Sequence, residues 1–70
     1  MSMFSEIQSE ITAKRLEAIL THAIAIGGEV KEFAKKYLYD WYIWECSETY
    51  GSYPTNPMIK REFEEEEKKE

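Results

Sequence analysis

The chain has 70 residues, a formal net charge of −5 and a sequence pI of about 4.9. This length allows one domain, whose core supplies only a few kcal/mol of stability. Cys46 is the only cysteine and His22 the only histidine, which excludes an internal disulfide and a Cys/His zinc site within one chain. We therefore expect support from self-association or a partner, with good helix packing in a monomer as the alternative.

The composition also indicates where in the cell the protein is found and what kind of molecule it binds. The excess of acid disfavours binding to a phosphate backbone, which depends on Lys and Arg. The first residues lack a basic stretch followed by an apolar block, so no secretory signal is expected. The longest apolar stretch, residues 23–26, is far too short to span a bilayer. With a lone free thiol, these features predict a cytoplasmic protein that does not bind membranes.

Residues 2–26 predict a helix, because they contain no Pro or Gly and are rich in helix formers. Gly27 suits the position after its last turn. The apolar stripe changes phase by roughly 130° along the helix. Its first part contains Phe4, Ile7 and Ile11, and its second part contains Leu16, Ile19, Leu20, Ala23 and Ile26. We favour one helix with two apolar faces over a break near Thr12.

Residues 29–50 predict a second helix with two apolar stripes on nearly opposite sides. The first stripe comprises Val30, Phe33, Ala34, Tyr37, Trp41 and Trp44. The second comprises Tyr39, Tyr42, Ile43, Cys46 and Tyr50. Aromatic residues also favour strands, so a strand over residues 37–44 is an alternative, although polar and apolar residues do not alternate there.

Residues 57–70 predict a short third helix, since Pro57 suits a first helical position. The expected fold is all-α: an antiparallel helical hairpin turning at Gly27 and Gly28, followed by this helix, with a four-helix-bundle dimer as an option. Residues 1–57 would form the hairpin and connecting loop, and residues 58–70 an acidic C-terminal helix or tail.

The second stripe is the candidate anchor for a partner. We expect the first stripe to form the core of the hairpin, which leaves the second stripe in excess. It can be covered by the third helix, by a second copy of the chain or by a foreign protein. Tyr combines apolar area with a polar tip, as interface hot spots do. The predicted anchor residues are Tyr39, Tyr42, Ile43, Cys46, Tyr50 and Tyr53.

An acidic run near the end of the chain is the second candidate. Carboxylates spaced along a helix can resemble a row of phosphates and meet basic residues on a target, as a DNA mimic does. The alternative is a solvated tail, as most charge runs are. The candidate residues are Glu62, Glu64, Glu65, Glu66 and Glu67.

Basic residues near the glycine pair offer a weaker hypothesis of DNA binding through Lys31, Lys35 and Lys36. Glu29 and Glu32 would repel phosphates at that helix start, so direct nucleic-acid binding is disfavoured. We find no phosphate-binding, metal-binding or redox motif, and no acid/base constellation. We predict no enzyme activity, no cofactor and no metal.

These features predict a protein that binds and inhibits, or modulates, a larger protein machine by steric occlusion. In its small size, acidity and lack of catalytic motifs, the chain is similar to small acidic accessory proteins of bacteriophages and mobile elements. That resemblance implies a host nucleic-acid-handling or defence complex as the target. The alternative is a homodimeric regulator or assembly subunit, with Tyr39, Tyr42, Cys46 and Tyr50 paired between copies.

Overall fold

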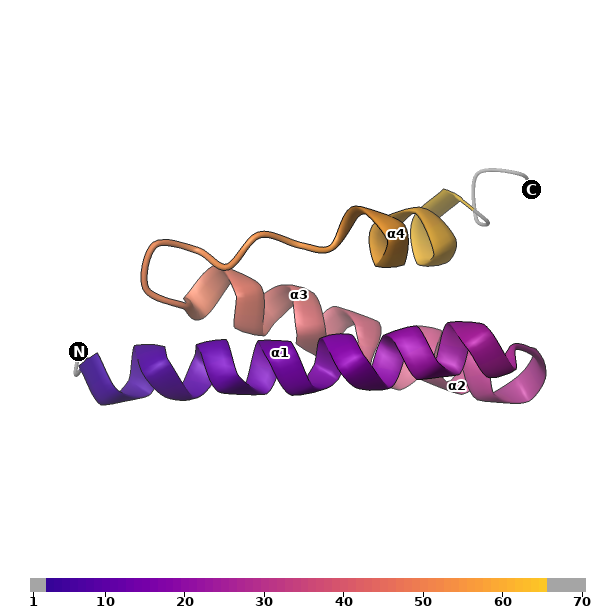
Figure 1. Cartoon of the computed structure of the whole chain (residues 1–70), viewed down its shortest axis with the longest axis horizontal. Helices are drawn as coiled ribbons and strands as arrows, with labels where there is room; N and C mark the ends of the chain where they lie inside the picture. Colours follow the sequence, from indigo (N-terminus) through magenta and orange to yellow (C-terminus); the bar gives the residue numbers. More distant parts are fainter. Residues whose placement is uncertain (1–2, 66–70) are drawn as a thin grey trace.

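The computed structural model describes residues 3–65, which form helices joined by short turns and by one connecting segment, residues 49–56 (Figure 1). The order of the helices is α1 (Met3–Ile26), α2 (Gly28–Tyr37), α3 (Tyr39–Glu48), α4 (Pro57–Lys60) and the π-helical turn η1 (Arg61–Glu65). No strand occurs in the described part of the chain. This confirms the all-α prediction and rejects a strand over residues 37–44.

Helix α1 is continuous through Thr12, as we favoured, and the chain reverses directly after it. Gly27 and Gly28 both adopt positive φ, at 73° and 58°, which residues with a side chain rarely do. The Gly27 N–H donates to the Ala23 carbonyl at 2.8 Å and so satisfies one of the last carbonyls of α1. The glycine pair therefore makes the predicted antiparallel turn, and α2 and α3 return alongside α1 (Figure 1).

The predicted second helix is divided at Leu38 into α2 and α3. Leu38 has φ −113° and ψ −30°, away from ideal helical values. Hydrogen bonds nevertheless run through the joint: the Leu38 N–H donates to Ala34 at 2.8 Å, and the Tyr42 N–H donates to Leu38 at 2.9 Å. The joint therefore bends the helix without reversing the chain, and α3 packs along α1.

The C-terminal residues return across the hairpin. Asn56 caps α4, because its side-chain oxygen accepts a hydrogen bond from the Met58 N–H at 2.9 Å, and Pro57 takes the first helical position. We call residues 57–65, which form α4 and η1, the C-terminal strap. In Figure 1 the strap lies above the hairpin formed by α1, α2 and α3.

The core is built by α1, α2, α3 and the strap together. Ile59 and Phe63 of the strap are almost fully buried and belong to the same cluster as the hairpin residues. The buried apolar residues are Ala13, Leu16, Leu20, Ala23, Ala34, Tyr39, Tyr42, Cys46, Ile59 and Phe63. Ile59 and Phe63 thus make the strap part of the core.

The prediction that the first aromatic stripe forms the core is wrong for its four aromatic residues. Phe33, Tyr37, Trp41 and Trp44 are 58%, 57%, 47% and 59% exposed, and of that stripe Ala34 alone is buried. The side of the hairpin covered by the strap is instead lined by the second stripe. Tyrosine can be buried there because each hydroxyl reaches a polar partner, which lowers the cost of removing it from water.

Candidate protein-binding surface

The structure disperses the predicted anchor residues. Tyr39, Tyr42 and Cys46 are buried within the chain, Ile43 and Tyr53 are half-buried, and Tyr50 is 81% exposed. Of the three coverings we considered for the second stripe, the structure shows the C-terminal part of the chain itself. Phe63 and Glu64 of the strap contact Tyr39, and the segment before α4 contacts Tyr42 and Cys46. The three buried residues therefore offer no surface to a partner in this conformation, and the predicted anchor does not form a continuous exposed patch.

One carboxylate on α1 joins two tyrosines, the buried Tyr42 and the half-buried Tyr53. The Glu17 side chain accepts hydrogen bonds from the Tyr53 hydroxyl at 3.0 Å and from the Tyr42 hydroxyl at 3.3 Å. The Asn56 N–H donates to the Tyr42 hydroxyl oxygen at 2.9 Å. Glu17 lies on α1, Tyr42 on α3 and the other two in the connecting segment. This network therefore fixes the connecting segment against both long helices.

Two acidic residues of the strap bind groups in the hairpin. The Tyr39 hydroxyl donates to Glu64 at 2.6 Å, and the Lys31 ammonium lies 2.9 Å from Glu62. The rings of Tyr39 and Phe63 pack with their centroids 5.3 Å apart. Part of the predicted acidic binding run thus holds the strap in place. The Glu65 side chain, and the whole of Glu66 and Glu67, lie outside the described residues.

The environment of this network favours neutral side chains. Burial raises the pKa of Tyr39 far above its usual value, and the hydrogen bond to the Glu64 carboxylate adds to the shift. Burial likewise raises the pKa of Tyr42, although the Asn56 N–H opposes the shift. Burial also raises the pKa of the Cys46 thiol. A thiol held protonated is a poor nucleophile, so the structure gives Cys46 the character of a core residue.

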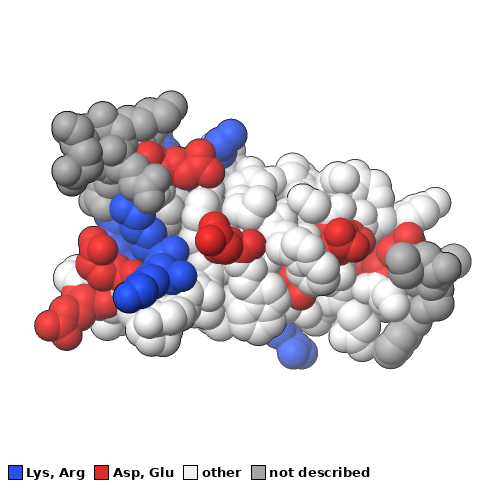
Figure 2. Space-filling model, turned by 180° about the vertical axis from the view of Figure 1, so that it is seen from behind, with Lys and Arg blue, Asp and Glu red and all other residues white. Residues whose placement is uncertain are grey.

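An exposed apolar surface is formed by the stripe that we expected to form the core. Spacings of three and four residues align its members along one side of α2 and α3. We call it the aromatic face, and it comprises Val30, Phe33, Tyr37, Trp41 and Trp44. The rings of Phe33 and Tyr37 contact each other with centroids 4.8 Å apart. Seen from behind, uncharged residues cover much of the molecule between separate groups of charged side chains (Figure 2).

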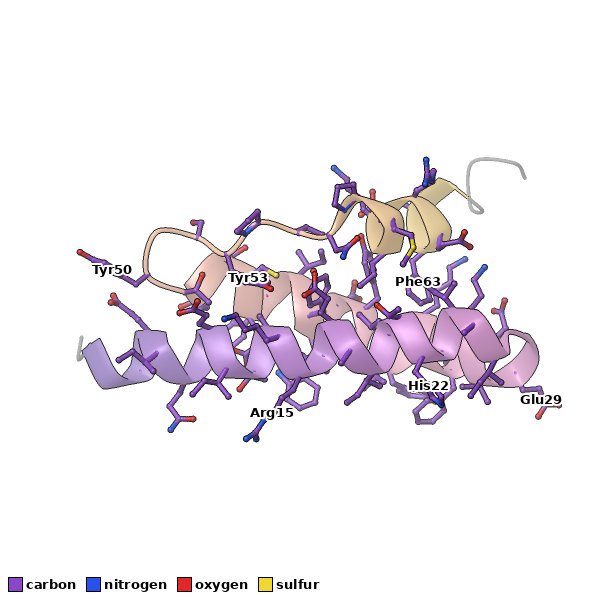
Figure 3. All side chains as sticks on the ribbon, in the orientation of Figure 1. Arg15, His22, Glu29, Tyr50, Tyr53 and Phe63 are labelled. Carbon is purple, nitrogen blue, oxygen red and sulfur yellow. The ribbon has the colours of Figure 1, made fainter. Side chains whose placement is uncertain are left out.

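Helix α1 adds a second apolar strip. In Figure 3, Arg15 and His22 point away from the strap, which carries Phe63 on the opposite side. Ile11, Ile19 and Ile26 each lie three or four residues from Arg15 or His22, and Ile7 lies four residues before Ile11, so these isoleucines share one side of α1. We call this strip the isoleucine ridge; its members are all at least 40% exposed, and they are Ile7, Ile11, Ile19 and Ile26. The side chain of Phe4, predicted to share this side, lies outside the described residues.

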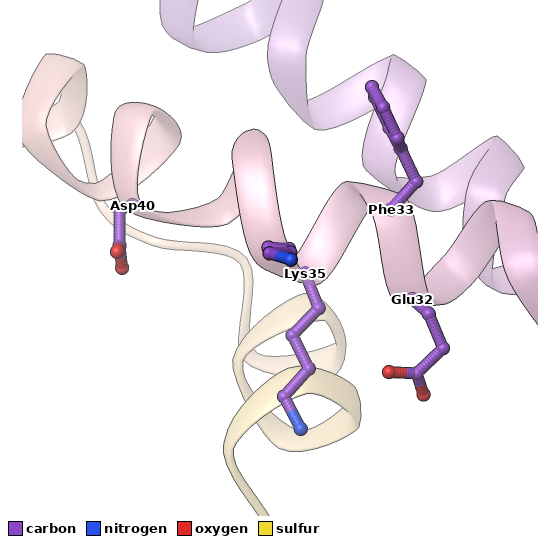
Figure 4. A pocket seen from close by; sticks show the side chains of 5 residues that line it. Glu32, Phe33, Lys35 and Asp40 are labelled. Atoms are coloured by element: carbon purple, nitrogen blue, oxygen red, sulfur yellow. The ribbon is translucent and has the colours of Figure 1, made fainter.

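Charged residues border the aromatic face on α2. A shallow, open hollow beside Phe33 is lined by Glu32, Lys35, Lys36 and Asp40. Phe33 and Lys35 leave α2 on opposite sides, with Phe33 pointing away from the strap (Figure 4). The Lys36 ammonium lies 5.5 Å from the centroid of the Tyr37 ring, within the range of a cation–π contact.

The described residues contain no group of three or more His, Cys, Asp or Glu arranged to hold a metal ion. Within the same part of the chain, every helix is too short or too polar to cross a membrane. Comparison of the chain with protein-family models, curated proteins and solved structures found no match to any of them.

Proposed function

We propose that the protein acts by binding another protein through the aromatic face, and that this binding inhibits or modulates a larger protein machine. The observation that carries the proposal is the exposure of two tryptophans, a phenylalanine and a tyrosine on one side of α2 and α3. Trp and Tyr are enriched at the centres of protein interfaces, because they combine large apolar area with a polar group.

The size of the face supports this proposal. Aromatic side chains carry about 150–250 Å² of surface, so each half-exposed ring leaves roughly 100 Å² open to water. The four rings together leave on the order of 400 Å² open, which is in the range of about 300–600 Å² for the largest patch on a typical monomer, a patch that is often functional. Keeping so much apolar surface in water is unfavourable, and a protein partner would remove it.

The polar groups at the face also suit a protein partner. Trp41 donates its ring N–H to Glu45 at 2.8 Å, so its polar atom is satisfied while much of its ring stays exposed. Tyr37 presents a ring that already accepts a lysine ammonium above it. Such preorganised rings lose little conformational freedom on binding. Steric occlusion of the surface they cover is the mechanism we propose.

The acidic run is left out of this binding surface. Glu62 and Glu64 have partners within the chain, where they hold the strap. Lys31 is engaged with Glu62, so the basic residues near the glycine pair are not arranged as a free cluster for phosphates. Because of these contacts, we propose the aromatic face as the anchor for a partner, in place of the second stripe and the acidic run.

The proposal is tested by placing a photoreactive phenylalanine analogue at Trp44 in the native cell. The expected result is a discrete adduct with a protein larger than this chain. The matched control carries the same analogue at Tyr50, which is more exposed but not part of the aromatic face. Loss of the position-44 adduct in a Phe33→Ser background supports the assignment of the face. The same adducts from both positions, or none from position 44, contradict it.

A further inference from the structure

We infer that a second copy of this chain covers the aromatic face in the free protein. The inference rests on the proposed function in one respect, the use of the aromatic face for binding: the second copy covers this face in the free protein, and the larger partner would displace it. The two copies would form a four-helix layer, with α1 of each copy packed against α2 and α3 of the other. The straps would then lie on the two outer sides of the dimer.

The available area matches the need of a stable pair. A standard interface buries about 800 Å² on each partner, and the aromatic face with the isoleucine ridge offers on the order of 700 Å² of apolar area before its polar rim is counted. Interfaces of permanent dimers are also more apolar than those of transient complexes. The core of the described chain is small, and self-association is a common way to support a domain of this size.

The charges on this side of the molecule are placed for a two-fold arrangement. The isoleucine ridge on α1 contains the exposed cation Arg15, which points to the side away from the strap (Figure 3). The exposed anion Glu48 follows Trp44 by one helical turn on α3. In a two-fold dimer in which α1 packs on α3 of the other copy, Arg15 of each copy comes near Glu48 of the other. The symmetry makes this contact twice. A parallel stacking of α1 on α1 would instead place like charges together.

The shape of the hairpin is compatible with this arrangement. Two antiparallel helices present one side to the strap and leave the other without a covering element in the described residues (Figure 1). Placing two such layers together is the usual way to complete a four-helix bundle. The dimer differs from the one predicted from sequence, since Tyr39, Tyr42 and Cys46 are buried inside each copy and cannot pair across the axis.

The test is sedimentation equilibrium of the full chain from low to high micromolar concentration. The expected mass is twice the chain mass of 8.3 kDa. Trp44→Ser should raise the dimer Kd at least about tenfold, as loss of a central aromatic residue does. Tyr50→Ser is the matched control and should leave the Kd unchanged. Circular dichroism of each variant verifies that the helices are retained.

A charge exchange tests the orientation of the copies. Arg15→Glu and Glu48→Arg should each weaken the dimer, and the double variant should recover most of the lost affinity. Unchanged affinity in both single variants overturns the two-fold placement. A monomeric mass for the wild-type chain overturns the whole inference, as does a dimer that Trp44→Ser and Phe33→Ser leave intact. If the chain is monomeric but still forms the adduct with a larger protein from position 44, the dimer inference is wrong and the proposed function still holds.

Discussion

The hydroxyl oxygen of Tyr42 accepts a hydrogen bond from the backbone N–H of Asn56 at 2.9 Å. Tyr42 is fully buried on α3, and Asn56 is the residue that caps α4. One phenol therefore fixes the position at which the strap begins. Its hydroxyl also donates to Glu17 on α1, so three separate parts of the chain meet at a single side-chain oxygen.

Replacement of Tyr42 by Phe should destabilise the protein by about 1–3 kcal/mol. The change keeps the ring but removes the acceptor for the Asn56 N–H, and a partly buried donor left without a partner carries a desolvation cost of this size. Urea denaturation followed by circular dichroism measures the effect. Tyr50→Phe removes an exposed hydroxyl and should be neutral. Equal stability of the two variants would show that the Asn56 contact contributes nothing.

Replacement of Phe63 by Ala should release the strap and loosen the core cluster to which Cys46 also belongs. Phe63 is almost fully buried, and truncation of a buried Phe costs about 3–5 kcal/mol. In the wild-type protein the thiol is buried with a raised pKa, so its reaction with a thiol reagent should be slow. The variant should react much faster at the same pH. Met58→Ala, an exposed position on the same strap, is the control that should stay slow.

Replacement of Trp44 by Ser should change the stability of the dilute, unassociated chain by no more than about 1 kcal/mol. Most of this side chain is already in water, and surface substitutions have small effects on folding. Leu20→Ala, in the core, should cost about 2–5 kcal/mol. Thermal unfolding at low protein concentration compares the two. A large loss of stability from Trp44→Ser would mean that its ring supports the fold of the monomer.

Stability should decrease in alkaline solution. The pKa values of Tyr39, Tyr42, Tyr53 and Cys46 are all raised in the folded chain, mainly by burial. The folded state thus holds these protons more tightly than the unfolded state, and the resulting stability is complete below the unfolded pKa values, near 8.5 for Cys and 10 for Tyr. It is lost as the pH rises beyond them toward the folded values. Denaturation curves at increasing pH above 9 measure this, and Tyr42→Phe should flatten the decline.

Much of the fold follows from local sequence signals. The lack of Gly and Pro before Gly27 predicts the long first helix, and the glycine pair predicts the reversal, as the structure confirms. The break at Leu38 has no such signal, because Leu is a good helix former and no Gly or Pro is near. It arises where the tertiary packing of α3 on α1 and under the strap overrides local preference.

The site could not be assigned from periodicity, because α2 and α3 carry apolar residues on both sides. Hydrophobicity favours Phe33, Trp41 and Trp44 as the core, yet the structure buries Tyr39, Tyr42 and Cys46. The choice depends on partners distant in sequence. Glu17 and Glu64 satisfy the tyrosine hydroxyls, and Phe63 seals the cluster. The sequence does contain the carboxylates that accept hydrogen bonds from these tyrosines. Which carboxylate reaches which tyrosine can be known only once the fold is known.

The strap also bears on solubility. Helices α4 and η1 cover one side of the hairpin, and the aromatic face is exposed on another. A chain that ends before Pro57 would therefore expose apolar side chains on both sides. Such a fragment would have exposed apolar surfaces on two opposite sides. Its copies could then associate into open-ended chains instead of a closed dimer. We therefore expect removal of the strap to promote aggregation.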